Sequence, residues 1–398
     1  MTWQLYVGLS AMMFFEFAVW GAWSPVLAAR LLGPLKMTGK QLGWIYGMMP
    51  LACIVAPLAA GQVVDRWVPT QWYLGVTHLV GGILLLVAAR TMRFVPLLLV
   101  MGLYSLSFAP TLALVNSLTF THMPDPEQNY FRVRMWGAIS WVLAGWALTA
   151  WRRSGKFQVR GADSLTLAGL FALVMGVYCF FLPHTPPAHK AGAIVPFLQA
   201  IYLLGDPNFA LFLALSFVVS TQLQFYFLGT ARFLGDIGTS DSIIPAAMSI
   251  AQAAQVVAMA AILPYTFQWM GYQWTLAAGA ALWLVMFLVY RRMRPRSMII
   301  ASMALHGLAY AFFFDAAFLY VKRVTPPEIP GSAQGLYTVV TMGLGLFVGT
   351  RLTGMVMDRL RDENGFRWRA IFLVPCVTLA ICAVAFAVFF KGQEVIAP

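Results

Sequence analysis

Long runs of apolar residues alternate with short polar segments along all 398 residues of the chain. A helix that crosses a lipid bilayer needs about 20 apolar residues, and the runs are of that order. Hydropathy predicts helices over 4–31, 40–64, 71–91, 94–119, 132–152, 164–183, 207–235, 241–265, 272–291, 297–322, 331–357 and 368–391. The pattern therefore predicts an all-α membrane protein with about twelve transmembrane helices.

A longer connection separates the sixth predicted helix from the seventh. It divides the chain into an N-terminal six-helix half over 1–183, a central loop over 184–206 and a C-terminal six-helix half over 207–398. The loop holds an apolar stretch from Ile194 to Leu204, which is too short to span and is expected to lie along the membrane surface. Six helices, a loop and six further helices are typical of transporters built from two parallel halves.

Composition agrees with a membrane protein. Hydrophobic residues make up 61% of the chain and charged residues only 10%, with a mean hydropathy of +0.76, whereas soluble domains average about 25% charged residues. The N-terminus lacks a basic segment and a cleavage site, so we interpret the first apolar run as a membrane helix. All four cysteines lie inside apolar runs without metal-ligand spacing, which predicts packing residues and no metal site: Cys53, Cys179, Cys376 and Cys382.

The net charge of +12 comes from basic residues placed mainly in loops at helix ends. Anionic lipid headgroups explain that placement, so we expect the lipid bilayer, and no nucleic acid, as the partner of these charges. The chain shows no nucleophile with a neighbouring base and no phosphate-binding loop. We therefore expect neither an enzyme nor a bound cofactor, and transport, if it occurs, without ATP.

Two acids, Glu16 and Asp315, lie deep in apolar runs. An ionised carboxylate at the bilayer centre costs about 3 kcal/mol on insertion scales, so such residues usually face a protein interior or a water-filled cavity. Glu16 shares a helix face with Trp20, four residues later. Two interpretations stay open for Glu16: a structural pair with a buried arginine, or a proton or substrate site.

Further polar and aromatic residues are expected on inward faces. Arg134 and Trp141 are seven residues apart on one helical stripe, which suits a ligand with hydroxyl groups and a flat ring, although Arg134 is also a candidate headgroup anchor. Gln224, Gln252 and Gln255 offer both donors and acceptors without charge, either for bonds between helices or for a neutral polar solute.

Helix 94–119 contains Pro110, which removes a backbone hydrogen bond and suits a gating element, and Asn116, which either joins helices or binds a solute. The membrane-embedded His78 and His306 are interpreted as packing or hydrogen-bonding residues. After the second helix, Gly61-Gln62-Val63-Val64-Asp65-Arg66 is similar to the G-x-x-x-D-[RK] loop of the major facilitator superfamily, where Gly61 would allow close helix contact and Asp65 and Arg66 would latch helix ends.

The chain resembles the nucleoside:proton symporter family of that superfamily, the bacterial nucleoside permeases. The matching pieces are, in order, Phe17-Ala18-Val19-Trp20-Gly21-Ala22-Trp23, His78, Pro110-Thr111-Leu112-Ala113-Leu114-Val115-Asn116, Arg134-Met135-Trp136-Gly137, Leu182-Pro183-His184, Gln224, Ser249-Ile250-Ala251-Gln252 and Ser332-Ala333-Gln334-Gly335. The resemblance implies the superfamily fold, a bacterial inner-membrane location with both termini in the cytoplasm, and a nucleoside site that is similar at Arg134, Gln224 and Gln252. More basic residues lie in the loops that this orientation places outside than in those it places inside, contrary to the positive-inside rule.

The family's site pattern is altered elsewhere in this chain. Its acid in the eighth helix corresponds to Gln255 and its proton-coupling acid in the tenth helix to Ala311, so both site acids are replaced. An asparagine becomes Phe227 and a threonine becomes Ala138, while Trp141 and Tyr310 occupy aromatic positions. We hypothesise that Glu16, and secondarily Asp315, takes over proton coupling.

These observations predict an alternating-access, proton-coupled nucleoside transporter that acts as a monomer. Arg134, Gln224, Gln252, Gln255 and Asn116 would bind the solute, and Trp141, Tyr310 and Phe227 would enclose its ring. Three alternatives stay open: a facilitator without proton coupling, a transporter of the same fold for sugars or another small polar metabolite, and a membrane sensor that binds without transport.

Overall fold

A computed structural model describes residues 2–124, 126–154, 162–187, 201–324, 330–363 and 365–392. Its α-helices are α1 Trp3–Trp23, α2 Leu27–Leu32, α3 Gly39–Arg66, α4 Thr70–Arg90, α5 Phe94–Phe108, α6 Thr111–His122, α7 Pro126–Arg153, α8 Asp163–Cys179, α10 Pro207–Asp236, α11 Ile244–Val257, α12 Leu263–Arg292, α13 Arg296–Tyr310, α14 Ala316–Val324, α15 Pro330–Thr338, α16 Leu346–Arg359, α17 Trp368–Ile371 and α18 Leu373–Val388. Within the described ranges, nine helices are long and apolar enough to cross a membrane.

Among the described residues, three short π-helical turns interrupt long helical runs of the C-terminal half: η2 Ala258–Ile262, η3 Ala311–Asp315 and η4 Val339–Gly345. Single π-turns inside α-helices are frequent at functional sites. The remaining elements are a 3₁₀ turn, η1 Tyr202–Gly205, and an antiparallel two-stranded hairpin of β1 Arg361–Asp362 and β2 Gly365–Phe366.

Several predicted helix bounds are wrong for identifiable reasons. The run predicted as one helix over 4–31 is two helices, because Pro25 lies in the break between α1 and α2 and has no N–H to continue the ladder. The gap predicted between 265 and 272 is helical except at Gly271, whose φ of 64° interrupts α12. Helix α7 begins at Pro126, earlier than predicted, and α8 ends at Cys179.

The chain forms two compact units. Unit 1 comprises Met1–Gly192 together with Leu234–Ser249, and unit 2 comprises Ala193–Phe233 and Ile250–Pro398. The end of α10 and the beginning of α11 therefore belong to unit 1. There, Ala246 N donates a hydrogen bond of 3.1 Å to the Thr149 hydroxyl of α7, and the Arg152 guanidinium donates one of 2.9 Å to the Asp241 carbonyl.

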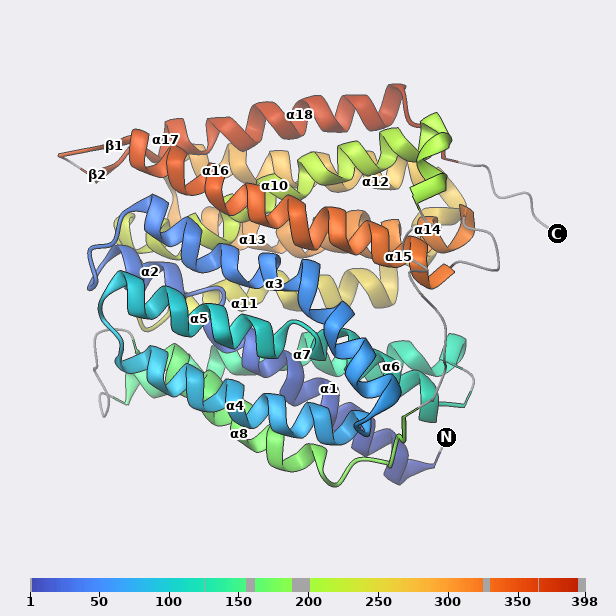
Figure 1. The fold of residues 1–398 in the computed structure, drawn as a ribbon. Helices are drawn as coiled ribbons and strands as arrows, with labels where there is room; N and C mark the ends of the chain where they lie inside the picture. The colour runs from blue at the N-terminus through green and yellow to red at the C-terminus, as the bar shows by residue number, and fades with distance from the viewer. Residues whose placement is uncertain are drawn as a thin grey trace. The chain divides into compact units, whose positions relative to one another are not determined.

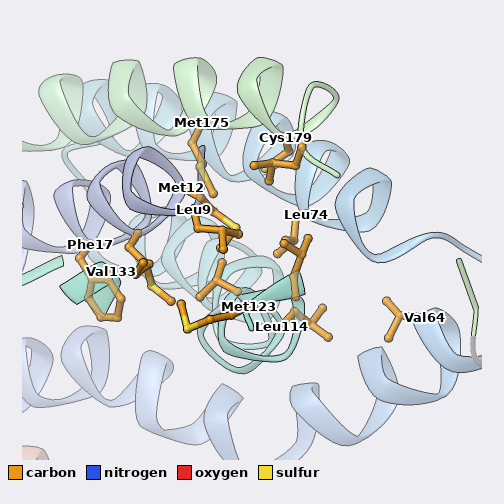
Figure 2. Close-up of a cluster of buried hydrophobic side chains, with 14 of the residues drawn as sticks. Leu9, Met12, Phe17, Val64, Leu74, Leu114, Met123, Val133, Met175 and Cys179 are labelled. Carbon is orange, nitrogen blue, oxygen red and sulfur yellow. The ribbon is translucent and has the colours of Figure 1, made fainter. Parts of the chain in front are cut away.

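Glycines bring helices of unit 1 into close contact. α4 and α8 lie side by side (Figure 1), and a methyl group added at Gly82 would lie 2.9 Å from the Leu173 side chain and 3.0 Å from the Gly169 carbonyl oxygen. α1 packs against α4, α6, α7 and α8 around a buried apolar cluster (Figure 2), which includes Leu9, Met12, Leu74, Met175 and Cys179. This packing fixes the rotation of α1 and with it the direction of its polar side chains.

Unit 2 is built around aromatic contacts. Phe212 of α10 stacks on Tyr337 of α15, with ring centroids 5.7 Å apart and planes at 16°, and contacts Tyr320 of α14 at 4.7 Å. Phe390, which follows α18, lies 5.2 Å from Tyr320. All four rings are buried, so they join the first and last helices of the C-terminal half in one apolar core.

Candidate functional site

A fully buried carboxylate on α1 has two polar partners from other helices. Glu16 has an exposed fraction of 0%, and its Oε1 accepts a hydrogen bond of 2.7 Å from the Thr111 hydroxyl. Its Oε2 lies 2.8 Å from Nε2 of His78, which is also buried. A buried charge is costly unless it is paired and hydrogen-bonded. Here the Thr111 hydroxyl supplies a hydrogen bond, and the His78 imidazole lies within ion-pair distance of the second carboxylate oxygen. The partner that we expected for a structural pair, an arginine, is wrong: the observed partner is an imidazole.

The orientation of the His78 ring is set by its own helix. Nδ1 lies 2.8 Å from the Leu74 carbonyl oxygen, one turn earlier in α4. A carbonyl oxygen only accepts, so Nδ1 carries a hydrogen and Nε2 is the nitrogen that faces Glu16. The edge of Phe108 packs against the ring, with centroids 5.9 Å apart and planes at 76°. The interpretation of His78 as a hydrogen-bonding residue agrees with this geometry, but its partner was not foreseen.

Thr111 lies at a break in the helical run that the sequence predicts over 94–119. α5 ends at Phe108 and α6 begins at Thr111, with Ala109 and Pro110 between them. The Thr111 hydroxyl lies 2.7 Å from the Phe108 carbonyl oxygen as well as 2.7 Å from Glu16. Sequence reasoning missed Thr111; its position directly after Pro110 was the available signal.

Arg134 and Trp141 of α7 both pack on α1. The Arg134 guanidinium carbon lies 4.0 Å from the centroid of the Phe17 ring, a cation–π geometry. Trp141 contacts Trp20 edge to face, with ring centroids 5.8 Å apart. Arg134 is half-buried, so its donors are partly accessible within an otherwise apolar interface.

Two glycines allow that approach of α1 and α7. A methyl group added at Gly137 would lie 2.7 Å from both an Arg134 nitrogen and the Phe17 ring. One added at Gly21 would lie 2.9 Å from Trp141. Gly137 therefore leaves room for the side chains of Phe17 and Arg134, and Gly21 leaves room for the side chain of Trp141.

Asn116 is half-buried on α6, and its amide donates a hydrogen bond of 2.9 Å to the Leu112 carbonyl. This hydrogen bond joins Asn116 to its own helix, one turn earlier.

In unit 2, the structure joins two residues that sequence reasoning placed in separate roles. The Gln255 amide of α11 donates a hydrogen bond of 3.2 Å to the carboxylate of Asp315, the last residue of the π-turn η3. Both side chains are half-buried. The carboxylate of Asp315 therefore lies beside the amide of Gln255.

The close contact of α11 with α13 explains how these residues meet. A methyl group at Gly307 would overlap the Ala251 carbonyl oxygen and would lie 2.6 Å from the Gln255 backbone nitrogen. The two backbones touch at this point, so the register between Gln255 and Asp315 is fixed by glycine.

His306 is a packing residue in this structure. Its ring stacks on Tyr226 at 3.7 Å and 18°, and its Nδ1 accepts a hydrogen bond of 3.0 Å from the Trp283 indole. Phe227 meets the same ring edge to face at 5.9 Å. Tyr310, one turn after His306, lies 4.8 Å from Phe314 between ring centroids. Phe227 and Tyr310 are both half-buried beside this aromatic group.

Gln224 of α10 is buried against α16, where a methyl group at Gly349 would lie 3.0 Å from its side chain. Gln252 of α11 is half-buried. The candidate residues thus fall into a set in unit 1 and a set in unit 2. The side chains of Gly61, Asp65 and Arg66 and most of the stretch 194–204 lie outside the described residues. Among the described residues, no group of three or more His, Cys, Asp or Glu side chains is placed to hold a metal ion.

Comparison with known proteins matches almost the whole chain. A family model described as Nucleoside H+ symporter matches residues 3–395. YegT of Escherichia coli (strain K12) is 31% identical over 403 residues, which cover 97% of this chain and 94% of YegT. Nucleoside permease NupG of the same strain is 25% identical over 415 residues, covering 99% of this chain and 98% of NupG.

A crystal structure of a mutant of the nucleoside transporter NupG superposes with a TM-score of 0.89 at 23% identity, covering 97% of this chain and 100% of that chain. The predicted fold class is confirmed: the chain is an all-helical, multi-pass membrane protein with the major facilitator superfamily fold.

Proposed function

The chain belongs to the nucleoside H+ symporter family, and we propose that it carries nucleosides across a membrane together with protons by alternating access. The observation that carries the proposal is the family match over residues 3–395, which leaves out only a few terminal residues. The fold supports it. We further propose that the protein acts as a monomer in the bacterial inner membrane.

For nucleoside binding we propose Arg134 and Asn116 from unit 1 and Gln224, Gln252 and Gln255 from unit 2. A guanidinium and several amides offer donors and acceptors for ribose hydroxyls and base edges without a negative charge. Arg134, Gln252 and Gln255 are half-buried within apolar helices, which supports a partly hydrated site.

Aromatic residues would enclose the base. Trp141 stands beside Trp20 in unit 1, and Phe227 and Tyr310 stand beside His306 in unit 2. Flat rings bind a nucleobase face by stacking, a contact that tolerates changes of base identity. For proton coupling we propose Glu16 and Asp315, and for helix gating we propose Gly61, Asp65, Arg66 and Pro110.

A second candidate function is a facilitator or a carrier of another polar solute. It is favoured by the replacement of both acids of the family pattern, at Gln255 and Ala311. The carboxylate of Asp315 beside Gln255 weighs against it, because an acid is present at this site after all.

Exchange in proteoliposomes tests the proposed function. Radiolabelled uridine should enter vesicles preloaded with unlabelled uridine, and unlabelled nucleosides should compete where pentoses and hexoses do not. Arg134→Ala should weaken uridine binding about ten- to a hundred-fold, because a hydrogen bond from a charged group contributes about 1.5–3 kcal/mol.

Arg132→Ala is the matched control, since Arg132 lies on the same helix but is exposed. Exchange of a sugar without exchange of uridine would contradict nucleoside transport and favour the second candidate function, a carrier of another polar solute. Equal effects of the two arginine variants on uridine exchange would show that Arg134 does not bind the nucleoside.

A further inference from the structure

We propose that Glu16, His78 and Thr111 form a proton-binding site inside unit 1 that passes its protonation state to the break between α5 and α6. The inference rests on the proposed proton-coupled transport and deepens it, because it assigns the coupling to one acid and names the residues through which that acid acts. Three observations carry it: the burial of the group, the fixed hydrogen on His78 Nδ1, and the double contact of the Thr111 hydroxyl.

The contacts limit where protons can sit. Because Nδ1 of His78 donates to the Leu74 carbonyl, the exchangeable positions are His78 Nε2 and the two Glu16 oxygens. Without a proton on either residue, the Nε2 lone pair would face a carboxylate oxygen at 2.8 Å in a buried place, an arrangement that is repulsive. The pair therefore keeps at least one proton, and with one proton its net charge is zero.

A second proton fits without breaking the described contacts. Nε2–H then faces Glu16 Oε2 at 2.8 Å, within ion-pair distance, and the new O–H on Glu16 Oε1 donates to the Thr111 hydroxyl oxygen at 2.7 Å. The site then carries one positive charge, held by the imidazolium. Binding and release of this proton change the net charge of a site whose carboxylate is 0% exposed. A buried charge is costly, so each protonation state favours a different arrangement of the polar groups around Glu16.

The Thr111 hydroxyl responds to the protonation of Glu16, because it has a single hydrogen to donate and two acceptors within reach. The hydroxyl oxygen lies 2.7 Å from Glu16 Oε1 and 2.7 Å from the Phe108 carbonyl oxygen. While Glu16 Oε1 is unprotonated, Thr111 donates to it. Once Oε1 carries a proton and donates, the Thr111 hydrogen turns to the Phe108 carbonyl. Phe108 is the last residue of α5, and the regular backbone hydrogen bonds of that helix end at the break that follows it.

Phe108 connects this break to the proposed nucleoside site of unit 1. Its ring contacts His78 at 5.9 Å and Trp20 at 6.4 Å between centroids. Trp20 in turn meets Trp141 at 5.8 Å. A change in the α5–α6 break therefore reaches an aromatic residue of the binding site through direct ring contacts.

Other titratable groups surround Glu16. The Tyr104 hydroxyl of α5 and the Cys179 thiol of α8 lie within electrostatic reach of its carboxylate. Arg134 of α7 stacks on Phe17, the next residue of α1. Tyrosine and cysteine ordinarily lose their protons only at alkaline pH, so we assign the exchangeable proton to Glu16 and His78 and not to these two groups.

The test combines exchange with proton movement in the same proteoliposomes. Uridine exchange shows whether the chain carries nucleosides at all, and a trapped pH-sensitive dye follows protons that enter with uridine. Glu16→Gln replaces the carboxyl by an amide of equal size, so we expect loss of uridine-dependent proton entry and of accumulation above equilibrium. Glu363→Gln, an exposed position in the β1–β2 hairpin, is the matched control and should behave as the wild type.

Thr111 supplies a second and independent variant. Thr111→Ser keeps the hydroxyl and should keep the pH profile of proton-driven uptake, whereas Thr111→Val removes it at nearly constant volume and should displace that profile. A purely structural role for Thr111 would change the amount of folded protein but not the position of the profile.

The outcomes separate the two proposals. Absence of uridine exchange in the wild type overturns the proposed function, whereas exchange without proton entry overturns only the coupling inference. Persistent proton entry in Glu16→Gln also overturns it, as does its loss in Asp315→Asn alone. Should Glu16→Gln fail to fold, identical pH profiles for Thr111→Val and Thr111→Ser would overturn the inference in its place.

Discussion

The Gln255 amide donates to the Asp315 carboxylate across 3.2 Å, so a neutral residue and an acid form one pair between α11 and the π-turn η3. The resemblance to the nucleoside:proton symporters implies an acid in the family at the position that Gln255 occupies here. Two carboxylates at this distance would repel each other, so an amide at 255 is the residue that fits beside Asp315. The amide at position 255 is therefore explained by the carboxylate of Asp315.

This pair gives a pH-dependent prediction. Gln255→Glu should lower stability by about 1–3 kcal/mol near neutral pH, because it removes the donor and adds a like charge. The loss should shrink as the pH falls, since one shared proton relieves the repulsion. Thermal unfolding in detergent at two pH values measures this.

The double variant Gln255→Glu with Asp315→Asn is the control for that prediction. It restores one acid and one amide with their positions exchanged, so its unfolding temperature should lie close to that of the wild type. Equal unfolding temperatures for Gln255→Glu and the wild type at both pH values would show that the contact is unimportant.

The glycine at the Arg134 site gives a second prediction. Gly137→Ala places a methyl group 2.7 Å from the Phe17 ring and from an Arg134 nitrogen, so we expect a loss of about 1–3 kcal/mol and weaker uridine binding. Gly335→Ala should leave both quantities unchanged or slightly raise stability, because among the described residues no atom beyond its own stretch of helix lies within 4 Å of the added methyl group. Similar behaviour of the two variants in unfolding and binding assays would contradict the packing described for α1 and α7.

Arg152 gives a third prediction, about unit 1. Its guanidinium pairs with Asp163, with one contact of 3.0 Å, and donates to the Asp241 carbonyl. Arg152→Gln should lower the unfolding temperature, corresponding to about 1–3 kcal/mol, because Asp163 is left buried without its partner. Arg153→Gln removes an exposed neighbouring charge and should have little effect. A larger effect of Arg153→Gln would show that net charge, and not the ion pair, governs stability.

His306 gives a fourth prediction. His306→Phe keeps an aromatic ring on Tyr226 but removes the acceptor of the Trp283 indole N–H, so stability should fall by about 1–2 kcal/mol. Proton entry should persist, because His306 packs and accepts in this structure. Loss of proton entry in a folded His306→Phe protein would assign His306 to coupling and contradict its interpretation as a packing residue.

Much of the architecture was determined by the sequence alone. Apolar length and the spacing of polar segments are local properties of the chain, so they predicted the membrane class and most helical runs. Pro110 was predicted to remove a backbone hydrogen bond inside one helix over 94–119, and the structure divides that run into α5 and α6. The break at Pro25 follows the same rule but was missed inside a long apolar run. The unusual acids Glu16 and Asp315 were also visible in the sequence, since carboxylates in apolar helices are costly and rare.

Only the tertiary structure decided what those acids contact. Glu16 meets His78 and Thr111 because buried glycines and apolar side chains set the rotation of α1 against its neighbours. Asp315 meets Gln255 because Gly307 lets α11 and α13 touch and a π-turn sets the direction of the carboxylate. Hydropathy determines which segments are helices, whereas helix rotation and close approach depend on packing between residues far apart in the chain, and these determine the chemistry of the site.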